Sequence, residues 1–255
     1  VVALYDNVLH RTAADVEIDE WVNQLQTGLP RETVASAFQQ SPEGLRQFVT
    51  GAYATILERS VAEIEINHWI GEMTGGLSEQ DVLRAFYSSG EYQALHTDNS
   101  DFVGSLYSKV LGREAGQSEL SDGVAALESG VPRATFVSTI FATAEYRSHV
   151  IADVYAEFLG RNPVADETDF WTNVLPFNGT MAAVMRTSVL SSDEYYRTAE
   201  VHTLVAHELK NEAFVAALYD DVLERSASQF EIGIWTTELN AGVSRTTVAG
   251  HIWDS

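Results

Sequence analysis

Apolar residues recur along the chain with the spacing of amphipathic helices. The first block places apolar side chains at i, i+1, i+4 and i+5, namely Leu4, Tyr5, Val8 and Leu9. This spacing puts them on one face of a helix. Runs of alternating β-branched residues between turn dipeptides, which would indicate strands, are nearly absent. The pattern therefore predicts an all-α protein.

The same block occurs five times, and each time an arginine follows its tyrosine by six residues. The tyrosines are Tyr5, Tyr53, Tyr107, Tyr155 and Tyr219, and the arginines are Arg11, Arg59, Arg113, Arg161 and Arg225. Successive tyrosines lie 48, 54, 48 and 64 residues apart. The first and third tyrosines are 102 residues apart, as are the second and fourth, so the first four copies form two matching pairs.

These spacings define tandem repeats of about 50 residues with roughly three helices each, arranged as pairs. We assign repeat 1 to 1–49, repeat 2 to 50–99, repeat 3 to 100–151, repeat 4 to 152–200, a linker helix to 201–213 and repeat 5 to 214–255. Repeat 1 begins inside its first helix and repeat 5 stops before its last element. We therefore expect both to be truncated, as in a piece excised from a longer protein.

The second helix of a repeat carries a tryptophan ten residues after the arginine. It is Trp21, Trp69, Trp171 or Trp235, and repeat 3 has Gly123 instead. We expect these indoles in the core, with sugar-stacking platforms as the alternative. We expect the gap at Gly123 to be refilled by other side chains, with an open groove as the alternative.

Turn signals frame the third helix. A glycine that suits a left-handed C′ position precedes it, at Gly28, Gly76, Gly130, Gly179 or Gly242. In repeat 1 the helix starts near Arg31, with Pro30 just ahead of it. An S/T-x-E element follows in four copies, and we expect its first residue to cap the next helix: Ser41, Ser89, Thr143 and Ser192.

A glutamate six residues after each arginine is equally uniform. These residues are Glu17, Glu65, Glu119, Glu167 and Glu231. The favoured interpretation is structural: the arginine binds helix-terminal carbonyls, and the glutamate reaches back to free N–H groups of the second helix. The alternative is a repeated carboxylate site for a cation.

The net charge of the chain excludes some classes of binding partner. The chain has 37 acidic and 15 basic residues, only two of them lysines, and a net charge of −22. Such a chain is unsuited to phosphate backbones and to anionic membrane surfaces. It has no cysteine, hence no disulfide or thiolate metal site. No apolar run reaches the ~18 residues of a membrane span. If the five repeat arginines are internal, the surface is more acidic still.

Candidate chemistry is sparse. No nucleophile elbow, phosphate-binding loop or zinc-binding histidine pair occurs, so we expect no enzyme and no catalytic residue. We expect no cofactor; calcium is a weak candidate, with Asp98 and Asp101 as its ligands, because their loop lacks the EF-hand ligand series. A solvated turn with Ser100 as N-cap is the favoured interpretation of that loop.

The repeat resembles a bacterial family known as domain of unknown function 4214. The resemblance rests on the Leu-Tyr-x-x-Val-Leu-x-Arg block, the tryptophan, the glycine and the Ser-x-Glu element, and it covers essentially the whole chain. The family usually has Gly-Leu before the tryptophan. Here the glutamates at Arg+6 stand in the glycine's place, which implies a tighter or more helical loop. A more distant resemblance is to the helical linker domain of phycobilisomes.

The resemblance implies an accessory module of large secreted or surface-layer-like bacterial proteins, often beside calcium-binding repeats, and defines no catalytic residue. We therefore expect a non-catalytic, extracellular or cell-surface scaffold that forms a surface layer, matrix or filament. Its partners would be other copies or neighbouring domains, with no nucleic acid and no membrane insertion. The alternatives are a carbohydrate-binding adhesin and an intracellular linker-type scaffold.

Overall fold

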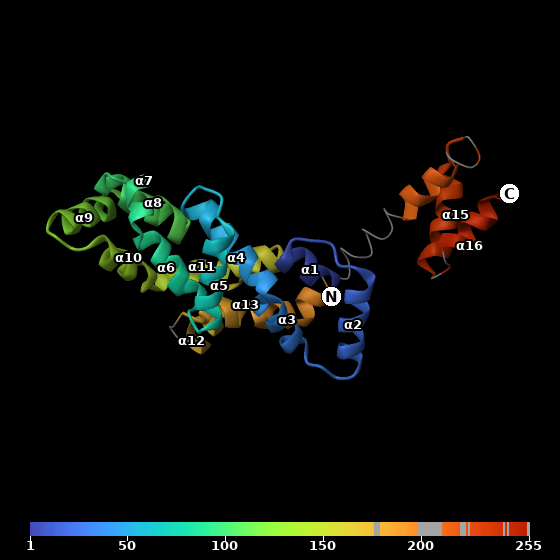
Figure 1. Ribbon diagram of the computed structural model, residues 1–255, viewed down its shortest axis with the longest axis horizontal. Helices are drawn as coiled ribbons and strands as arrows, with labels where there is room; N and C mark the ends of the chain where they lie inside the picture. The colour runs from blue at the N-terminus through green and yellow to red at the C-terminus, as the bar shows by residue number, and fades with distance from the viewer. Residues whose placement is uncertain are drawn as a thin grey trace. The chain divides into compact units, whose positions relative to one another are not determined.

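The computed structural model describes residues 1–175, 179–197, 211–219, 223, 225–241, 243 and 245–253. The chain forms two compact units, Val1–Tyr195 and Tyr196–Ser255 (Figure 1). No β-strand occurs in the described ranges, and helices account for most of their residues. The predicted all-α repeat architecture is confirmed.

Each repeat of the first unit has three principal helices. The first helices are α1 (Val2–Leu9), α4 (Pro42–Ile56), α8 (Asn99–Leu111) and α11 (Ala144–Leu159). The second helices are α2 (Asp15–Gln26), α5 (Glu63–Thr74), α9 (Gln117–Glu128) and α12 (Ala165–Val174). The third helices are α3 (Arg31–Gln40), α6 (Glu79–Ser88), α10 (Arg133–Phe141) and α13 (Met181–Ser191).

Connections between repeats differ within and between the two pairs. α4 and α11 each run unbroken from the cap residue into the next repeat's first helix. Between repeats 2 and 3 the short helix α7 (Gly90–Leu95) is separate from α8. In the second unit, residues 211–219 are helical, followed by α15 (Gln229–Asn240) and α16 (Arg245–Trp253). Most of the predicted linker helix lies outside the described residues.

Local hydrogen bonds set the helix boundaries. The four predicted N-caps are confirmed, because each hydroxyl accepts a backbone N–H three residues on at 3.0 to 3.1 Å: Ser41, Ser89, Thr143 and Ser192. Gly28, Gly76 and Gly130 have φ of +99°, +111° and +100° as expected. Gly179 does not, because α12 has already ended at an extended Leu175. Gly242 lies outside the described residues.

The third helices pair between the outer two repeats and between the inner two repeats of the first unit. α3 of repeat 1 packs against α13 of repeat 4, and α6 of repeat 2 packs against α10 of repeat 3 (Figure 1). Repeat 1 corresponds to repeat 3 and repeat 2 to repeat 4, so α3 corresponds to α10 and α6 to α13. The contact between α3 and α13 is therefore equivalent to the contact between α10 and α6, with the two pairs of repeats exchanged. The first unit is thus a pair of pairs rather than a stack in which each repeat touches only its neighbours.

Aromatic packing links the helices inside a repeat. In repeat 2, Phe86 lies 4.7 Å from Tyr53 and 5.1 Å from Trp69, measured between ring centroids. The Trp69 indole N–H donates to the Tyr53 hydroxyl at 3.1 Å, and the same bond joins Trp171 to Tyr155. The indoles are half-buried, whereas the tyrosines that accept these bonds are buried.

Repeat 3 fills the space left by its missing tryptophan. Gly123 is buried, and a Cβ placed on it would lie 2.9 Å from Val103 Cγ1 and 3.0 Å from Phe136 Cζ. Phe136 occupies the position that Val34 and Val82 hold in repeats 1 and 2. A larger side chain on the third helix therefore compensates for the smaller one on the second. The expected refilling is present, and the groove alternative is wrong.

We predict that Gly123→Ala destabilises the protein although it sits in a helix. Two buried side chains would have to move, and overpacking of this kind costs about 1–3 kcal/mol. Gly71→Ala is the matched control at another mid-helix position, where nothing lies within 4 Å of an added Cβ. It should stabilise by about 0.5–1 kcal/mol through helix propensity. Urea unfolding measures both, and equal stabilisation by the two substitutions would refute the packing explanation.

Candidate functional site

The repeated arginine lies just beyond the first helix and forks onto the repeated glutamate of the second. Arg11, for example, donates from Nη1 and Nη2 to the two carboxylate oxygens of Glu17 at 2.9 and 2.8 Å. The same bidentate pair, at 2.6 to 3.1 Å, occurs in the other four repeats. Two parallel bonds fix the angle between the two side chains as well as their distance.

A second glutamate completes the arrangement in repeats 1 to 4. It is the glutamate of the S/T-x-E element, and it accepts bonds from the arginine Nε and Nη2: Glu43, Glu91, Glu145 and Glu194. We call each arginine with its two glutamates the arginine clasp. One guanidinium thereby joins the end of the first helix, the start of the second and the helix that follows the third.

Backbone and aromatic contacts hold the clasp in place. In repeat 2, Arg59 lies 4.6 Å from the centre of the Tyr53 ring and donates to the Ser60 carbonyl at 3.0 Å. Glu65 accepts the backbone N–H of Ala62 at 2.9 Å, which is the predicted capping contact. The arginine therefore binds a loop carbonyl, not a helix-terminal one as expected, because its fork is occupied by carboxylates.

The clasp arginines are not internal, contrary to expectation. Their side chains keep between 34 and 39% exposure in repeats 1 to 4, and 51% in repeat 5. Their positive charge is nevertheless matched by carboxylates at bonding distance. The arginine bonds and a backbone N–H lower the pKa of the first glutamate to about 2 in every repeat. The carboxylates proposed for a cation site are therefore already bound to arginine.

The two candidate calcium ligands, Asp98 and Asp101, bind other groups of the protein. Asp98 caps α8 by accepting the N–H groups of Ser100 and Asp101 at 2.9 and 3.1 Å, so Asp98 rather than Ser100 is the N-cap. Asp101 in turn lies 2.7 Å from His96 Nδ1. No cluster of three metal-ligating side chains occurs within the described ranges.

Polar bonds between repeats come from residues outside the repeated set. Arg186 of α13 makes a bidentate ion pair with Glu79 of α6, whose side chain is only 12% exposed. Gln39 of α3 donates to Thr187 of α13 at 3.0 Å. The sequence pattern could not reveal these contacts because each occurs once. The clasp did leave a signal, since its second glutamate follows the arginine by 32 or 33 residues.

A groove of about 770 Å³ runs along the paired helices α3 and α13, beside α5 and α6. Of the described residues that line it, none is aromatic. Sugar rings are commonly held against aromatic faces, so this groove gives the adhesin alternative no support. The tryptophans are half-buried, and their indole N–H groups bond to tyrosine in repeats 2, 4 and 5.

Sequence comparison matches the profile of one family, described as Domain of unknown function (DUF4214), at residues 1–48, 44–96, 92–150 and 192–255. Most of repeat 4 falls between the last two segments, yet it carries the same clasp. Neither the curated proteins nor the solved structures that were searched gave a match. Among the described helices, none has the length and apolar character to cross a membrane.

We predict that Arg59→Lys lowers the melting temperature. Lysine keeps the charge but cannot bridge two carboxylates with a planar fork. Arg46→Lys is the control, because Arg46 makes a single exposed ion pair with Glu63 at 2.7 Å and such pairs contribute little. Circular dichroism melting should show a drop of several degrees for the first variant and about none for the second. Equal drops would argue against the clasp.

We also predict that the stabilising effect of Glu65 depends on pH. Its pKa is about 2 in the folded chain, below its ordinary value of 4.5. Its contribution is therefore present above the unfolded pKa and disappears as pH falls through the folded one. Glu65→Gln should be less stable than the parent chain at neutral pH, and the two should converge by about pH 2. A stability difference that stays constant with pH would contradict this.

Proposed function

The chain belongs to the family described as Domain of unknown function (DUF4214), and from that premise we propose that it is a non-catalytic assembly module whose helical repeats bind one another. The observation that carries the proposal is the pairing of third helices between repeats 1 and 4 and between repeats 2 and 3. Both the consecutive repeats 2 and 3 and the distant repeats 1 and 4 thus recognise each other through the third helix.

The repeated polar residues support this assignment. Arginine, glutamate, tyrosine, tryptophan and the cap residues are engaged within the repeat in the described ranges, as the clasp and the indole bonds illustrate. A catalytic group would need a free nucleophile or base beside a substrate site. What recurs in this chain is therefore a folding unit, and what varies is the surface through which units meet.

The second unit offers one such surface. It contains a single third helix, α16, in its described residues. The position 24 residues after the clasp arginine is fully buried in α3 and α10, at Ala35 and Val137, and partly exposed in α6, at Leu83. The equivalent Ala249 of α16 stays partly exposed. We take the third helix of a repeat in a second copy of the chain to be its partner.

Charge and composition suggest where the module works. At −22 the chain repels its own copies, so screening by salt or divalent cations should favour assembly. We place the module in a larger secreted or cell-surface bacterial protein, where an acidic, lysine-poor surface meets high ionic strength. A surface layer, matrix or filament is the form of assembly that tandem repeats would build.

Sedimentation velocity at increasing protein concentration tests the proposal. We expect reversible self-association that strengthens with added salt, and Ala249→Arg should weaken it at least tenfold, equivalent to about 1.4 kcal/mol. Gly233→Arg on α15 is the control, since Gly233 is exposed and has open space around it. A monomer at every concentration and salt level would overturn the proposal, and so would equal weakening by both variants.

A further inference from the structure

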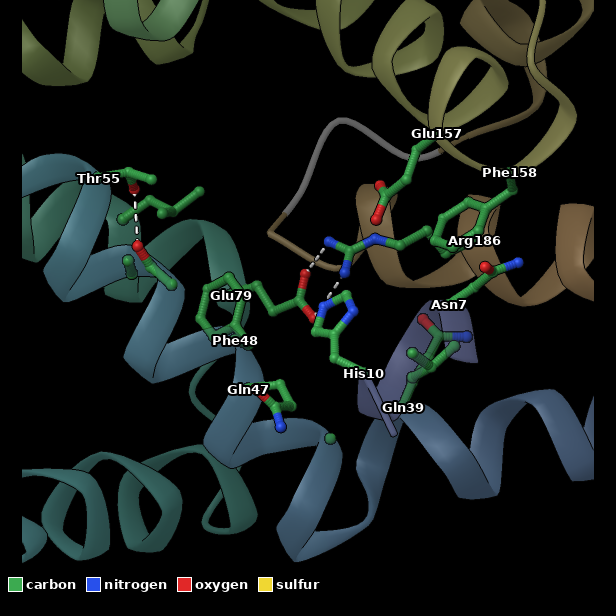
Figure 2. A pocket seen from close by; sticks show the side chains of 15 residues that line it. Asn7, His10, Gln39, Gln47, Phe48, Thr55, Glu79, Glu157, Phe158 and Arg186 are labelled. Atoms are coloured by element: carbon green, nitrogen blue, oxygen red, sulfur yellow. Dashed lines mark hydrogen bonds and ion pairs between the residues drawn. The ribbon is translucent and has the colours of Figure 1, made fainter. Parts of the chain in front are cut away.

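A second cavity, of about 300 Å³, opens between helices of repeats 1, 2 and 4 (Figure 2). Its walls come from α1, α3 and α4 on one side and from α6, α11 and α13 on the other. The Arg186–Glu79 ion pair crosses it, and Phe48 and Phe158 lie on either side of that pair in the view. The clasps and the α3–α13 contact do not require this space.

The cavity lies where repeat 1 departs from the repeat pattern. Three residues after the cap hydroxyl, repeats 2, 3 and 4 carry a buried tyrosine: Tyr92, Tyr146 and Tyr195. Repeat 1 has Gly44 there, and Gly44 lines the cavity. Any Cβ at this position would overlap the carbonyl oxygen of Phe38, so the close approach of α3 requires glycine. The backbone of Phe38 and Gln39, rather than another side chain, takes the space next to Gly44, and the cavity opens beside it.

Three of the side chains that could donate hydrogen bonds into the cavity are already engaged. Both terminal nitrogens of Arg186 donate to Glu79. The side-chain amide of Asn7 donates to the Tyr195 hydroxyl at 3.0 Å, and that of Gln47 donates to the Leu9 carbonyl at 3.1 Å. A phosphate or a carboxylate that binds at Arg186, Asn7 or Gln47 would have to break one of these bonds.

Two hydrogen-bond acceptors at the cavity, in contrast, remain available to a ligand. No side chain in the described ranges forms an ion pair with Glu157, whose carboxylate points into the cavity towards Arg186 (Figure 2). Gln39 Oε1 is buried and accepts no hydrogen bond from the residues that the structure describes, while its amide nitrogen donates to Thr187. The Ala35 carbonyl, 3.4 Å from that nitrogen, can only accept, which fixes the amide in this orientation. Desolvation raises the pKa of Glu157 and outweighs the charge of the nearby Arg186, which lowers it.

We propose that this cavity binds a small organic cation, a primary ammonium on a one-ring body. Two carboxylates against one guanidinium leave the site a net charge of −1, with His10 counted as neutral. The ammonium would donate to Glu157, and the ring would pack against Phe48 and Phe158. A volume near 300 Å³ is at the lower end of small-molecule sites and suits a single ring.

Phenethylamine is the probe, titrated into the purified chain and followed by calorimetry. We expect saturable binding at one site, and 2-phenylethanol, which has the same ring but no charge, should bind at least tenfold more weakly. Glu157→Gln should reduce the affinity for phenethylamine about tenfold. Glu20→Gln, at an exposed position on α2 away from the cavity, is the matched control and should leave the affinity unchanged.

A blocking variant separates this site from general attraction of amines to an acidic protein. Gly51 lines the cavity from the middle of α4, and an added Cβ meets nothing within 4 Å. Gly51→Leu should therefore fold and abolish binding, whereas Gly71→Leu, in an equally open position on α5, should retain it. The proposal is overturned if phenethylamine does not saturate a single site. It is equally overturned if Glu157→Gln and Gly51→Leu bind as the parent chain does.

Discussion

One guanidinium that binds two carboxylates from different helices is the constraint on which each complete repeat depends. It fixes the end of the first helix, the start of the second and the start of the helix after the third. The distance along the chain from arginine to second glutamate is 32 residues in three repeats and 33 in the fourth. The spacing between repeat tyrosines, in contrast, varies from 48 to 64 residues. Length variation is tolerated between clasps and hardly at all within them.

The two places where a repeat loses a large aromatic residue have opposite outcomes. At Gly123 the neighbouring Val103 and Phe136 close the space, which is what a packed core requires. At Gly44 the backbone of α3 takes the space of the side chain, and a cavity bordered by charged and amide groups opens beside it.

Much of the fold could be predicted from the sequence because it depends on local chemistry. Hydroxyl caps such as Ser41, the left-handed glycines such as Gly76 and the helical periodicity all act within a few residues. The pairing of α3 with α13 could not be predicted, because it joins residues about 150 positions apart and its bonds, such as Gln39 to Thr187, occur once. The N-cap at Asp98 was misassigned to Ser100 because both residues can cap a helix.

The residues of the candidate sites also include some that the sequence could reveal and some that it could not. Each clasp residue was identified by its repetition, yet its partners were not, since repetition shows that a residue matters and not what it touches. The cavity residues Glu157 and Arg186 follow no repeat pattern and came to light only from their positions in the fold. Assembly through helix faces and ligand binding in the cavity therefore depend on the least repetitive part of the sequence.

Side-chain NMR of the arginine Nε–H groups tests the central claim, that the clasps hold the repeats together, most directly. In Arg11, Arg59, Arg113 and Arg161 the Nε–H donates to the second glutamate, whereas Arg225 has no such partner within the described residues. The account predicts four Nε–H protons that exchange slowly with water, and fast exchange for Arg225. Equally fast exchange at all five would contradict it.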